Sequence, residues 1–475
     1  MKKMFLSAFI LLISAICDAR VKLPDLISNN MVLQQESEVA LWGKCEPKSK
    51  VKVTVSWDGS TTSTMADAEG NWKVYVKTPS AGGPYSINFN DGEDTVVENV
   101  LIGEVWLCLG QSNMAMTMRG YKSQPVEDAM KYIADAKPSC PIRICKIKRS
   151  TGFTEAETCE ASWRTHTPEV VSQASATAYF FALKLQETLN VPIGVIVSAW
   201  GGSKIEAWMS RETLEAGFAS DVDLSFIDAG QQPEKPQHAP TMLYNGMLGP
   251  VKNYQIKGFT WYQGCSNRNN PELYSRLQPE FVKMLRKLWS NDELPFYYVQ
   301  IAPYEYKGRD KIDAALLREA QAENSKTIPH SGMVVSMDCG DDGCIHPAKK
   351  KPIGDRLAYL ALQKTYGMSC IDAEPPMYES HEIKGDAVHV KFTETLYGGV
   401  GPRGRNLVGF EVAGEDRKFY PAEARCDKDN HVVVVKSDSV SAPVAVRYGF
   451  RNCSPVSVYN NFGIPASPFR TDNWK

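Results

Sequence analysis

The middle of the chain alternates short apolar runs with longer segments of helical periodicity, and this pattern constrains the fold more than any other feature. Residues 105–109 (VWLCL) and 193–197 (IGVIV) carry no polar side chain. A strand has this composition when both of its faces are covered, as in a parallel sheet. Strands of this kind joined by helices predict an α/β fold, with a parallel sheet flanked by helices.

The same alternation predicts the other elements of this central domain, which we place at residues 101–374. Apolar residues at helical spacing predict helices over residues 170–189, 271–289, 314–324 and 349–366. Apolar runs predict further strands over residues 256–260, 296–301 and 333–337.

The segments on either side of this domain have a different period. Residues 51–55 (VKVTV), 72–76 (WKVYV) and 387–392 (AVHVKF) alternate apolar and polar side chains. Alternation with period two, broken by turn residues, is typical of antiparallel strands with one buried face. We therefore expect β-sandwich-like domains at both ends of the chain, over residues 20–100 and 375–475.

Residues 1–19 predict export. Lys2 and Lys3 precede an apolar stretch over residues 4–16, and Ala19 offers a small residue at a cleavage site. A stretch of this length is too short to span a bilayer and is typical of a secretory signal peptide. The sequence therefore predicts a periplasmic or secreted protein with no membrane-spanning segment after cleavage.

Charge and cysteine content narrow the possible functions. The 53 basic and 55 acidic side chains give a formal net charge of −2. Without a basic excess to neutralise phosphates, the chain is not expected to bind nucleic acid. Twelve cysteines, including Cys17 in the predicted signal peptide, are scattered without a CxxC pair, so they predict no metal site. Nothing in the sequence predicts an oligomeric state.

Ser112 follows directly on the apolar run at residues 105–109, within GQSNM at residues 110–114. The carboxyl end of a strand is where α/β sheets place their ligands. A serine hydroxyl there can attack a substrate, and neighbouring backbone N–H groups can face the negative charge that develops. A turn or a helix cap is the alternative on these residues alone.

Two further strand ends carry groups that suit an oxyanion hole. Gly201 and Gly202 follow the run at residues 193–197 and would let a backbone N–H approach a substrate oxygen closely. Residues 261–267 (WYQGCSN) offer an amide side chain as a second donor. A tight turn and a solvent-facing glutamine are the alternatives.

His346 lies between a predicted strand end and a predicted helix, with Asp338, Asp341 and Asp342 upstream. Histidine is the side chain best suited to take a hydroxyl proton near neutral pH, and a carboxylate partner would fix its tautomer. The three aspartates also admit a metal site, although carboxylates bunched in one loop are more often solvated or capping groups.

Together these segments resemble the sialate O-acetylesterases, which are SGNH/GDSL-type hydrolases. The motifs occur in the order of that family: GQSNM at residues 110–114, WGGSKIEAW at 200–208, WYQGCSN at 261–267 and IHP at 345–347. Shorter matches extend the resemblance from residues 23–35 to the tail PASPFRTD at residues 465–472. The resemblance implies an SGNH-hydrolase-like domain that removes O-acetyl groups from sugars, with no metal and no organic cofactor.

The resemblance also implies roles for individual residues. Ser112 matches the nucleophile and His346 the general base, while Gly201 or Gly202 and Gln263 or Asn267 match the oxyanion donors. Substrate contacts are expected from polar and aromatic side chains beside these motifs, namely Asn113, Trp200, Glu206, Trp208 and Trp261. The tryptophans could instead belong to the core.

Departures from the family pattern leave the third member of the triad open. Relatives carry glutamate where this chain has Cys265, and many carry aspartate or serine where it has Cys344. Gly343 stands three residues before the histidine, where the wider superfamily has aspartate. The orienting group is therefore Asp342, Asp338 or a backbone carbonyl.

Cys265 and Cys344 are expected on neighbouring loops of one site, so we predict a disulfide between them, with Cys339–Cys344 as the competing pair.

Two other functions stay open beside a sialate O-acetylesterase. One is an esterase for acetyl xylan or another glycan. The other is a catalytically inactive glycan-binding relative.

Overall fold

The computed structural model describes residues 20–393, 406–427 and 432–474. The predicted signal peptide at residues 1–19 lies outside the described residues. Within the described ranges, no helix is long and apolar enough to cross a membrane.

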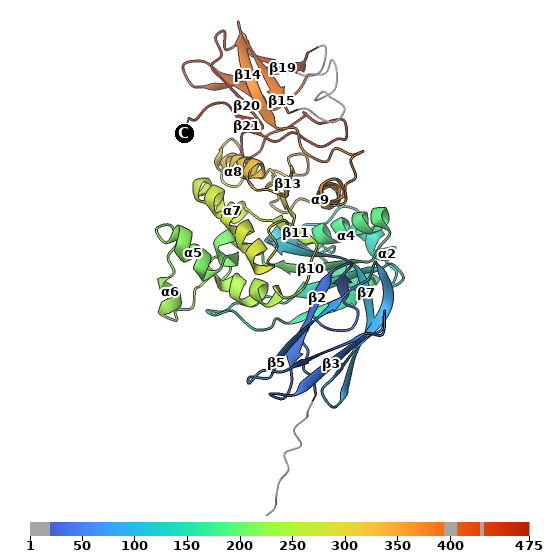
Figure 1. The fold of residues 1–475 in the computed structure, drawn as a ribbon. Coiled ribbons are helices and arrows are strands. Elements are labelled where there is room, and N and C mark those ends of the chain that lie inside the picture. Colours follow the sequence, from blue (N-terminus) through green and yellow to red (C-terminus); the bar gives the residue numbers. More distant parts are fainter. Residues whose placement is uncertain (1–19, 394–405, 428–431, 475) are drawn as a thin grey trace, which may run out of the picture.

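A mixed α/β domain with a large central sheet occupies the middle of the molecule (Figure 1). The strands of this sheet are β7 (Asp94–Gly110), β8 (Ile142–Ile147), β9 (Ala161–Thr165), β10 (Ile193–Ala199), β11 (Gly258–Tyr262), β12 (Phe296–Val299) and β13 (Ser331–Val334). They lie in the order β13-β12-β11-β7-β10-β8-β9, and all neighbours are parallel except the pair β8 and β9. The predicted α/β class is confirmed.

Helices cover both faces of this sheet. The longer helices are α4 (Ala176–Leu189), α7 (Pro271–Leu288), α8 (Asp313–Thr327) and α9 (Lys351–Lys364). Along β7, Val105 and Leu107 belong to the hydrophobic core that includes α7 and α8, whereas Trp106 and Cys108 belong to the core that includes α4 and α9. Because successive side chains of a strand point to opposite faces, this alternation explains why the predicted run is apolar at every position.

The helix predicted over residues 170–189 is two helices, α3 (Pro168–Gln173) and α4. The Thr167 hydroxyl accepts a hydrogen bond from the backbone N–H of Val170, and the Ser175 hydroxyl accepts one from Ala178. Each hydroxyl satisfies an N–H that has no partner within its helix, so Ser175 caps a second helix that begins at Ala176.

Short helices occupy the loops between the longer elements. They are α1 (Ser112–Ala115), α2 (Ala129–Ala134), α5 (Arg211–Phe218), α6 (Ser225–Asp228), η1 (Ile205–Trp208), η2 (Tyr244–Leu248), η3 (Gly249–Val251) and η4 (Cys265–Asn267). Several of these loops follow the carboxyl ends of the central strands and so supply the walls of the site described below.

The N-terminal strands are β1 (Val32–Gln34), β2 (Glu38–Lys44), β3 (Lys50–Val55), β4 (Thr61–Met65), β5 (Asn71–Lys77) and β6 (Gly82–Asn90). Four of these six, β1, β3, β4 and β6, are joined to the central sheet, whereas β2 and β5 pair with each other as a separate two-stranded sheet. β7 pairs with β6 and β1 over its first part, and with β10 and β11 over its second. The domain boundary expected at residue 100 therefore falls inside one continuous strand.

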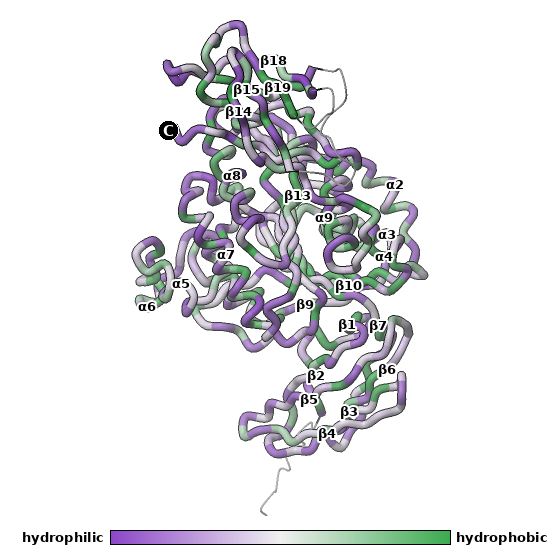
Figure 2. Tube along the Cα trace, turned by 45° about the horizontal axis from the view of Figure 1, so that its top comes forward, coloured by the Kyte–Doolittle hydropathy of each residue, from purple (hydrophilic) through white to green (hydrophobic). Residues whose placement is uncertain are grey.

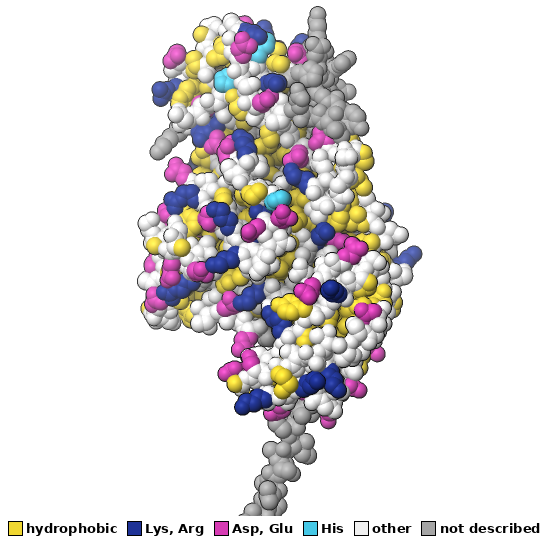
Figure 3. Space-filling view, in the orientation of Figure 1, with side chains coloured by type: hydrophobic (Ala, Val, Ile, Leu, Met, Phe, Trp, Pro, Cys, Tyr) yellow, Lys and Arg dark blue, Asp and Glu magenta, His cyan; other side chains and the backbone are white. Residues whose placement is uncertain are grey.

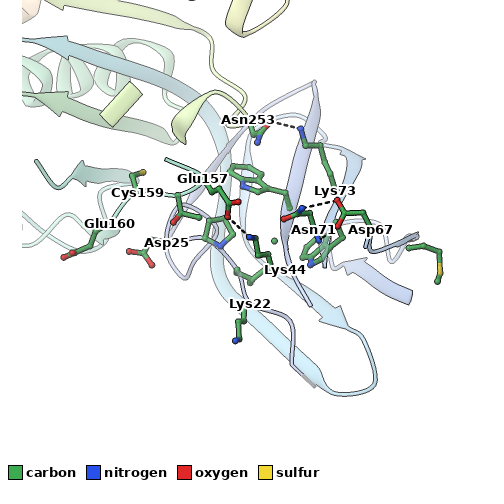
Figure 4. A pocket seen from close by; sticks show the side chains of 17 residues that line it. Lys22, Asp25, Lys44, Asp67, Asn71, Lys73, Glu157, Cys159, Glu160 and Asn253 are labelled. Carbon is green, nitrogen blue, oxygen red and sulfur yellow. Dashed lines mark hydrogen bonds and ion pairs between the residues drawn. The ribbon is translucent and has the colours of Figure 1, made fainter. Parts of the chain in front are cut away.

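A seam joins the N-terminal strands to loops of the central domain, around a cavity of about 900 Å³ (Figure 4). Lys44 on β2 forms an ion pair with Glu157 at 2.5 Å, and Lys73 on β5 donates a hydrogen bond to Asn253 at 2.6 Å. Two polar contacts thus bridge the seam.

The C-terminal strands form two antiparallel sheets, one of β14 (Tyr378–Lys384), β15 (Ala387–Phe392), β18 (Glu423–Cys426) and β19 (Val432–Lys436), the other of β16 (Phe410–Ala413), β17 (Phe419–Pro421), β20 (Ala445–Tyr448) and β21 (Phe469–Arg470). Val388 and Val435 of the first sheet share a core with Val412 and Val446 of the second. The two sheets therefore pack face to face.

Hydrophobic residues follow the central strands, whereas the outer turns are hydrophilic (Figure 2). On the face shown in Figure 3, acidic and basic side chains are interspersed rather than gathered into a field of one sign. This distribution agrees with the balanced charge of the chain.

Candidate active site

A cavity of about 900 Å³ lies at the carboxyl ends of β7, β10 and β11. Residues from the four segments singled out in the sequence line it, among them Ser112, Gly201, Asn267 and His346. β7, β10 and β11 are parallel neighbours, so their carboxyl ends meet at one edge of the sheet, where α/β proteins bind ligands.

Ser112 is the first residue of α1, two positions after the end of β7. Gly110 has φ +146°, and a Cβ at this position would lie 2.3 Å from the backbone oxygen of Tyr262, so the turn requires glycine. The carbonyl of Ser112 accepts a hydrogen bond from the Tyr121 hydroxyl at 3.0 Å. The backbone that presents the hydroxyl of Ser112 is therefore held on both sides.

His346 is oriented by an amide side chain. Its Nδ1 lies 2.7 Å from Oε1 of Gln124, and its ring packs edge-on against Tyr121 at 5.0 Å between centroids. An amide oxygen only accepts hydrogen bonds, so Nδ1 carries the proton and Nε2 keeps a free lone pair. This is the tautomer that a general base requires.

The electrostatic surroundings keep His346 uncharged. Burial and, second, the charge of Lys350 lower the pKa of His346 to about 4. Lys350 is buried as well, which lowers its own pKa to about 7, and its Nζ donates to Oδ1 of Asn113 at 2.5 Å. At neutral pH the imidazole is therefore ready to accept a proton.

The aspartates expected to orient the histidine point elsewhere. Both oxygens of Asp338 accept hydrogen bonds from the guanidinium of Arg356, at 2.7 and 2.6 Å. Asp342 forms an ion pair with Arg309. The structure therefore brings neither carboxylate to His346, because each is paired with an arginine. In the described part of the chain, no three His, Cys, Asp or Glu side chains are grouped to hold a metal ion.

Two groups beside Ser112 are placed to donate to an oxyanion. A Cβ at Gly201 would lie 3.4 Å from Cβ of Ser112, so the backbone of Gly201 passes close to this serine. Asn267 lines the cavity and donates one amide N–H to Oε2 of Glu206 at 2.8 Å, which leaves its second N–H for a ligand. Gly202, with φ +76°, lines the same wall.

Gln263 lies behind this wall. It is fully buried, and its amide nitrogen donates to the carbonyl of Ser203 at 3.0 Å and to Oδ1 of Asn267 at 2.7 Å. Both N–H groups are therefore used within the protein. Of the two amides that the sequence offered, the geometry favours Asn267 as the donor and Gln263 as its support.

The side chains expected to contact substrate divide into two groups. Glu206 lines the cavity, and Trp200 is half-buried with the guanidinium of Arg149 at 5.6 Å from its ring. Asn113 is buried, and its amide donates to the carbonyl of Ile345 at 3.0 Å while its Oδ1 accepts from the lysine behind it. Asn113 thus supports the residue before the histidine rather than a substrate.

Trp208 and Trp261 are fully buried and contact each other edge to face at 6.2 Å between ring centroids. The indole N–H of Trp208 donates to the hydroxyl of Ser203 at 3.0 Å. The expectation that these two rings stack on a sugar is wrong, because both belong to the core beneath the site.

The disulfide expected beside the site is not formed. Cys265 and Cys344 are both thiols, as are all cysteines within the described ranges. Sγ of Cys344 donates to the carbonyl oxygen of His346 at 3.3 Å, and burial raises the pKa of Cys265.

Three residues at or beside the cavity, Tyr121, Gln124 and Arg149, lie outside every motif of the sequence, whereas Lys204 belongs to the motif at residues 200–208. Tyr121 and Gln124 lie in the loop between α1 and α2. Arg149 and Lys204 line the cavity, and neither has an ion-pair partner among the residues that the structure describes. A third cation, Arg268, is paired with Asp313 at 2.9 Å.

A serine, a neutral histidine and two candidate oxyanion donors around one cavity are an arrangement that suits carboxylic-ester hydrolysis. The family model for carbohydrate esterases described as sialic acid-specific acetylesterases matches residues 102–363. The chain belongs to this family and is an enzyme of the carboxylic-ester hydrolase class.

Full-length relatives agree with this assignment. The chain is 28% identical over 488 residues to the sialate O-acetylesterase of Homo sapiens, covering 93% of this chain and 91% of that protein. It is 27% identical over 516 residues to the Mus musculus sialate O-acetylesterase, covering 93% of each. The crystal structure of a carbohydrate acetylesterase from Xanthomonas citri matches with a TM-score of 0.86 at 33% identity, over 96% of this chain and all of that one (100%).

Proposed function

We propose that the protein is an exported SGNH-type serine esterase that removes O-acetyl groups from sialic acids or related glycans through an acetyl-serine intermediate. The observation that carries this proposal is the meeting of Ser112, His346 and Asn267 in one cavity at the carboxyl edge of the parallel sheet. Family membership supports the carbohydrate ester as the substrate class.

The first half of the reaction acylates the serine. Nε2 of His346 takes the proton of the Ser112 hydroxyl while Oγ forms a bond to the acetyl carbonyl carbon. The carbonyl oxygen becomes an oxyanion, and the free N–H of Asn267 and the backbone N–H of Gly201 stabilise it. The bond from carbon to the sugar oxygen then breaks, and the imidazolium gives its proton to that oxygen.

The second half releases acetate. His346 takes a proton from water as the water oxygen bonds to the acetyl carbon, through the same oxyanion site. The bond to Oγ breaks, the proton returns to Ser112, and acetate leaves. Each proton transfer uses Nε2, so Nδ1 must stay protonated throughout, and Gln124 holds it in that state.

Gln124 therefore occupies the place of the triad carboxylate. Like a carboxylate, its amide oxygen fixes the tautomer and the ring orientation of His346. Unlike a carboxylate, it adds no charge to stabilise the imidazolium, which agrees with the low pKa of the histidine.

The charge of the cavity favours an acidic sugar over a neutral one. Arg149 and Lys204 line it without an ion-pair partner in the described ranges, against one such carboxylate, Glu206, which accepts a hydrogen bond from Asn267. The remaining positive charge attracts a carboxylate. Sialic acids carry a carboxylate and xylan does not. An esterase for acetyl xylan remains the second candidate, because the esterase machinery itself does not distinguish the two substrates.

The central test is acetate release from p-nitrophenyl acetate by wild-type protein and by Ser112→Ala. The variant is expected to lose activity by roughly 1,000-fold or more, since removal of a nucleophile abolishes covalent catalysis. Ser172→Ala, on the outer helix α3, is the matched control. Equal activity in Ser112→Ala would contradict the mechanism, and an inactive wild type would favour a glycan-binding relative.

Two further measurements test the finer parts of the proposal. Acetate release from O-acetylated sialic acids and from acetyl xylan, compared as kcat/KM, distinguishes the two substrates. N-terminal sequencing of the protein recovered outside the cytoplasm is expected to begin at Arg20, and an intact Met1 would contradict export.

A further inference from the structure

We propose that the catalytic domain and the C-terminal β-domain together form a second sugar-binding subsite, which holds the glycan chain that carries the acetylated sugar. This inference rests on the proposed function and deepens it. It makes oligosaccharides, rather than single acetylated sugars, the preferred substrates.

The subsite is a second cavity, of about 1050 Å³, beside the catalytic one. Residues 268–270 line both cavities. Leu273 lines the catalytic cavity, and its neighbour Glu272 lines the second one. In the same way, Tyr306 lines the catalytic cavity and Lys307 the second one. The two cavities are therefore neighbours along the same two chain segments, and a glycan bound in one can extend into the other.

The walls of the second cavity come from both domains. Leu316 belongs to α8 of the catalytic domain, whereas Arg470, Asn473 and Trp474 belong to the C-terminal tail. The half-buried indole of Trp474 packs against Phe419 and Arg417, and its part that lines the cavity offers an apolar surface, while Asn269 and Asn473 offer amides. Apolar surface beside a few polar groups is the usual composition of a small-molecule site, and it suits the C–H face and the hydroxyls of a sugar.

Several polar side chains of this cavity are available to a ligand. Lys307 and Lys311 form no ion pair, and the amides of Asn269 and Asn473 form no hydrogen bond, among the residues that the structure describes. A protein surface that is not used for binding also carries such groups. Here, however, they converge on one cavity that adjoins the catalytic centre.

The frame around these free groups is rigid. Asn452 of the C-terminal domain donates to Oδ1 of Asp313 at 2.8 Å and accepts from the backbone N–H of Ala314 at 2.9 Å. Arg470 forms an ion pair with Glu319 on α8 at 2.8 Å. Because these contacts fix the two domains against each other, the cavity exists before a glycan binds, which lowers the entropic cost of binding.

The cavity at the N-terminal seam fits this role less well (Figure 4). It shares no lining residue with the catalytic cavity, so a glycan bound there is not held to a sugar at Ser112. Its Lys44 and Lys73 are already bonded across the seam. The seam therefore serves as a control region in the experiment.

The test is the dependence of kcat/KM on glycan length. The substrates are one O-acetylated sialic acid, free and as the terminal residue of a disaccharide and a trisaccharide. We expect at least a tenfold rise from the free sugar to the trisaccharide, carried by KM. A tenfold rise corresponds to about 1.4 kcal/mol, within the range of one or two good hydrogen bonds.

Two variants locate the subsite. Lys307→Ala combined with Asn473→Ala is expected to reduce the ratio of kcat/KM between trisaccharide and free sugar to below about threefold, since each lost hydrogen bond is worth a few-fold in binding. Lys22→Ala, in the seam cavity, is expected to keep the wild-type ratio. The dependence of kcat/KM on length is also measured with acetylated xylo-oligosaccharides, which represent the neutral substrate.

The failures of this inference and of the proposed function are distinguishable. Equal kcat/KM for all lengths, or an unchanged ratio in the double variant, overturns the subsite while the serine esterase stands. If the ratio of kcat/KM between trisaccharide and free sugar falls in Lys22→Ala and not in the double variant, the glycan chain binds at the seam, and the inference is overturned. No acetate from either series overturns the proposed function and the subsite together.

Discussion

Replacement of Gln124 by glutamate is expected to move the acid limb of activity to higher pH. In the wild type the amide oxygen of Gln124 lies 2.7 Å from Nδ1 of His346, and the pKa of the imidazole is about 4. A carboxylate at the same place stabilises the imidazolium, and an opposite charge at this range raises a histidine pKa by about 1 to 3. The expected pKa in Gln124→Glu is therefore about 5 to 7.

The size of the effect follows from the fraction of neutral imidazole. At pH 5 about nine tenths of His346 is neutral when its pKa is 4, and about one tenth when its pKa is 6. Because only the neutral form can act as a base, kcat/KM at pH 5 is expected to fall roughly tenfold in Gln124→Glu. At pH 8 the imidazole is neutral in both proteins, so their activities should differ far less.

The assay is kcat/KM for acetate release between pH 3.5 and 8. Gln231→Glu is the matched control, because Gln231 is exposed and its replacement adds the same charge away from the cavity. Gln124→Ala separates orientation from charge, since it removes the acceptor for Nδ1–H and is expected to lower kcat without moving the acid limb upward. An acid limb at the same pH in Gln124→Glu and wild type would refute the assigned contact.

Three further predictions concern other parts of the site. Asn267→Ala should lower kcat by roughly 100- to 1,000-fold, because the oxyanion loses a donor, and steady-state kinetics measure this loss. Asp342→Asn should keep kcat/KM within about twofold, since this carboxylate pairs with Arg309 and not with His346, and a tenfold loss would restore it as the triad member. Trp261→Ala should lower the free energy of unfolding by about 3 to 5 kcal/mol, because the ring is fully buried, and urea denaturation with unchanged stability would contradict its place in the core.

Local composition is sufficient to predict the central strands and the edge of the sheet that carries the site. Burial on both faces leaves the central part of β7 and β10 apolar, and the period-two alternation of Trp72, Val74 and Val76 matches their burial in β5. Because strand ends in a parallel sheet meet at one edge, the positions of Ser112 and Asn267 after two such strands are enough to predict that they share one site.

Gln124 could not be predicted in the same way. It is separated from His346 by 222 residues and belongs to a loop with no periodicity or motif. Its contact depends on how that loop folds over the carboxyl edge of the sheet. Asp342 and Asp338, which precede the histidine in the sequence, are the candidates for its partner, whereas the tertiary structure pairs them with Arg309 and Arg356.

The prediction that Trp208 and Trp261 contact the substrate is wrong for a related reason. Trp208 and Trp261 stand in motifs at strand ends, where one residue faces the ligand and its neighbour faces the core. Trp200 and Gly201 remain near the surface, but the turn of η1 places Trp208 inside. In such short turns, packing decides whether a side chain points to the ligand or to the core, so the amino-acid composition of the turn does not predict its direction.

The continuity of β7 limits how this architecture can be divided or recombined. The strand has 17 residues and spans roughly 55 Å at about 3.3 Å per residue. It passes from the N-terminal sheet to the turn of Ser112 without a linker. A truncated protein beginning near residue 101 would lose the β1 partner of Leu101, Ile102 and Gly103. Exchange of the N-terminal domain between homologues would require a splice within a hydrogen-bonded strand, so that domain and the turn that carries Ser112 are expected to be inherited as one unit.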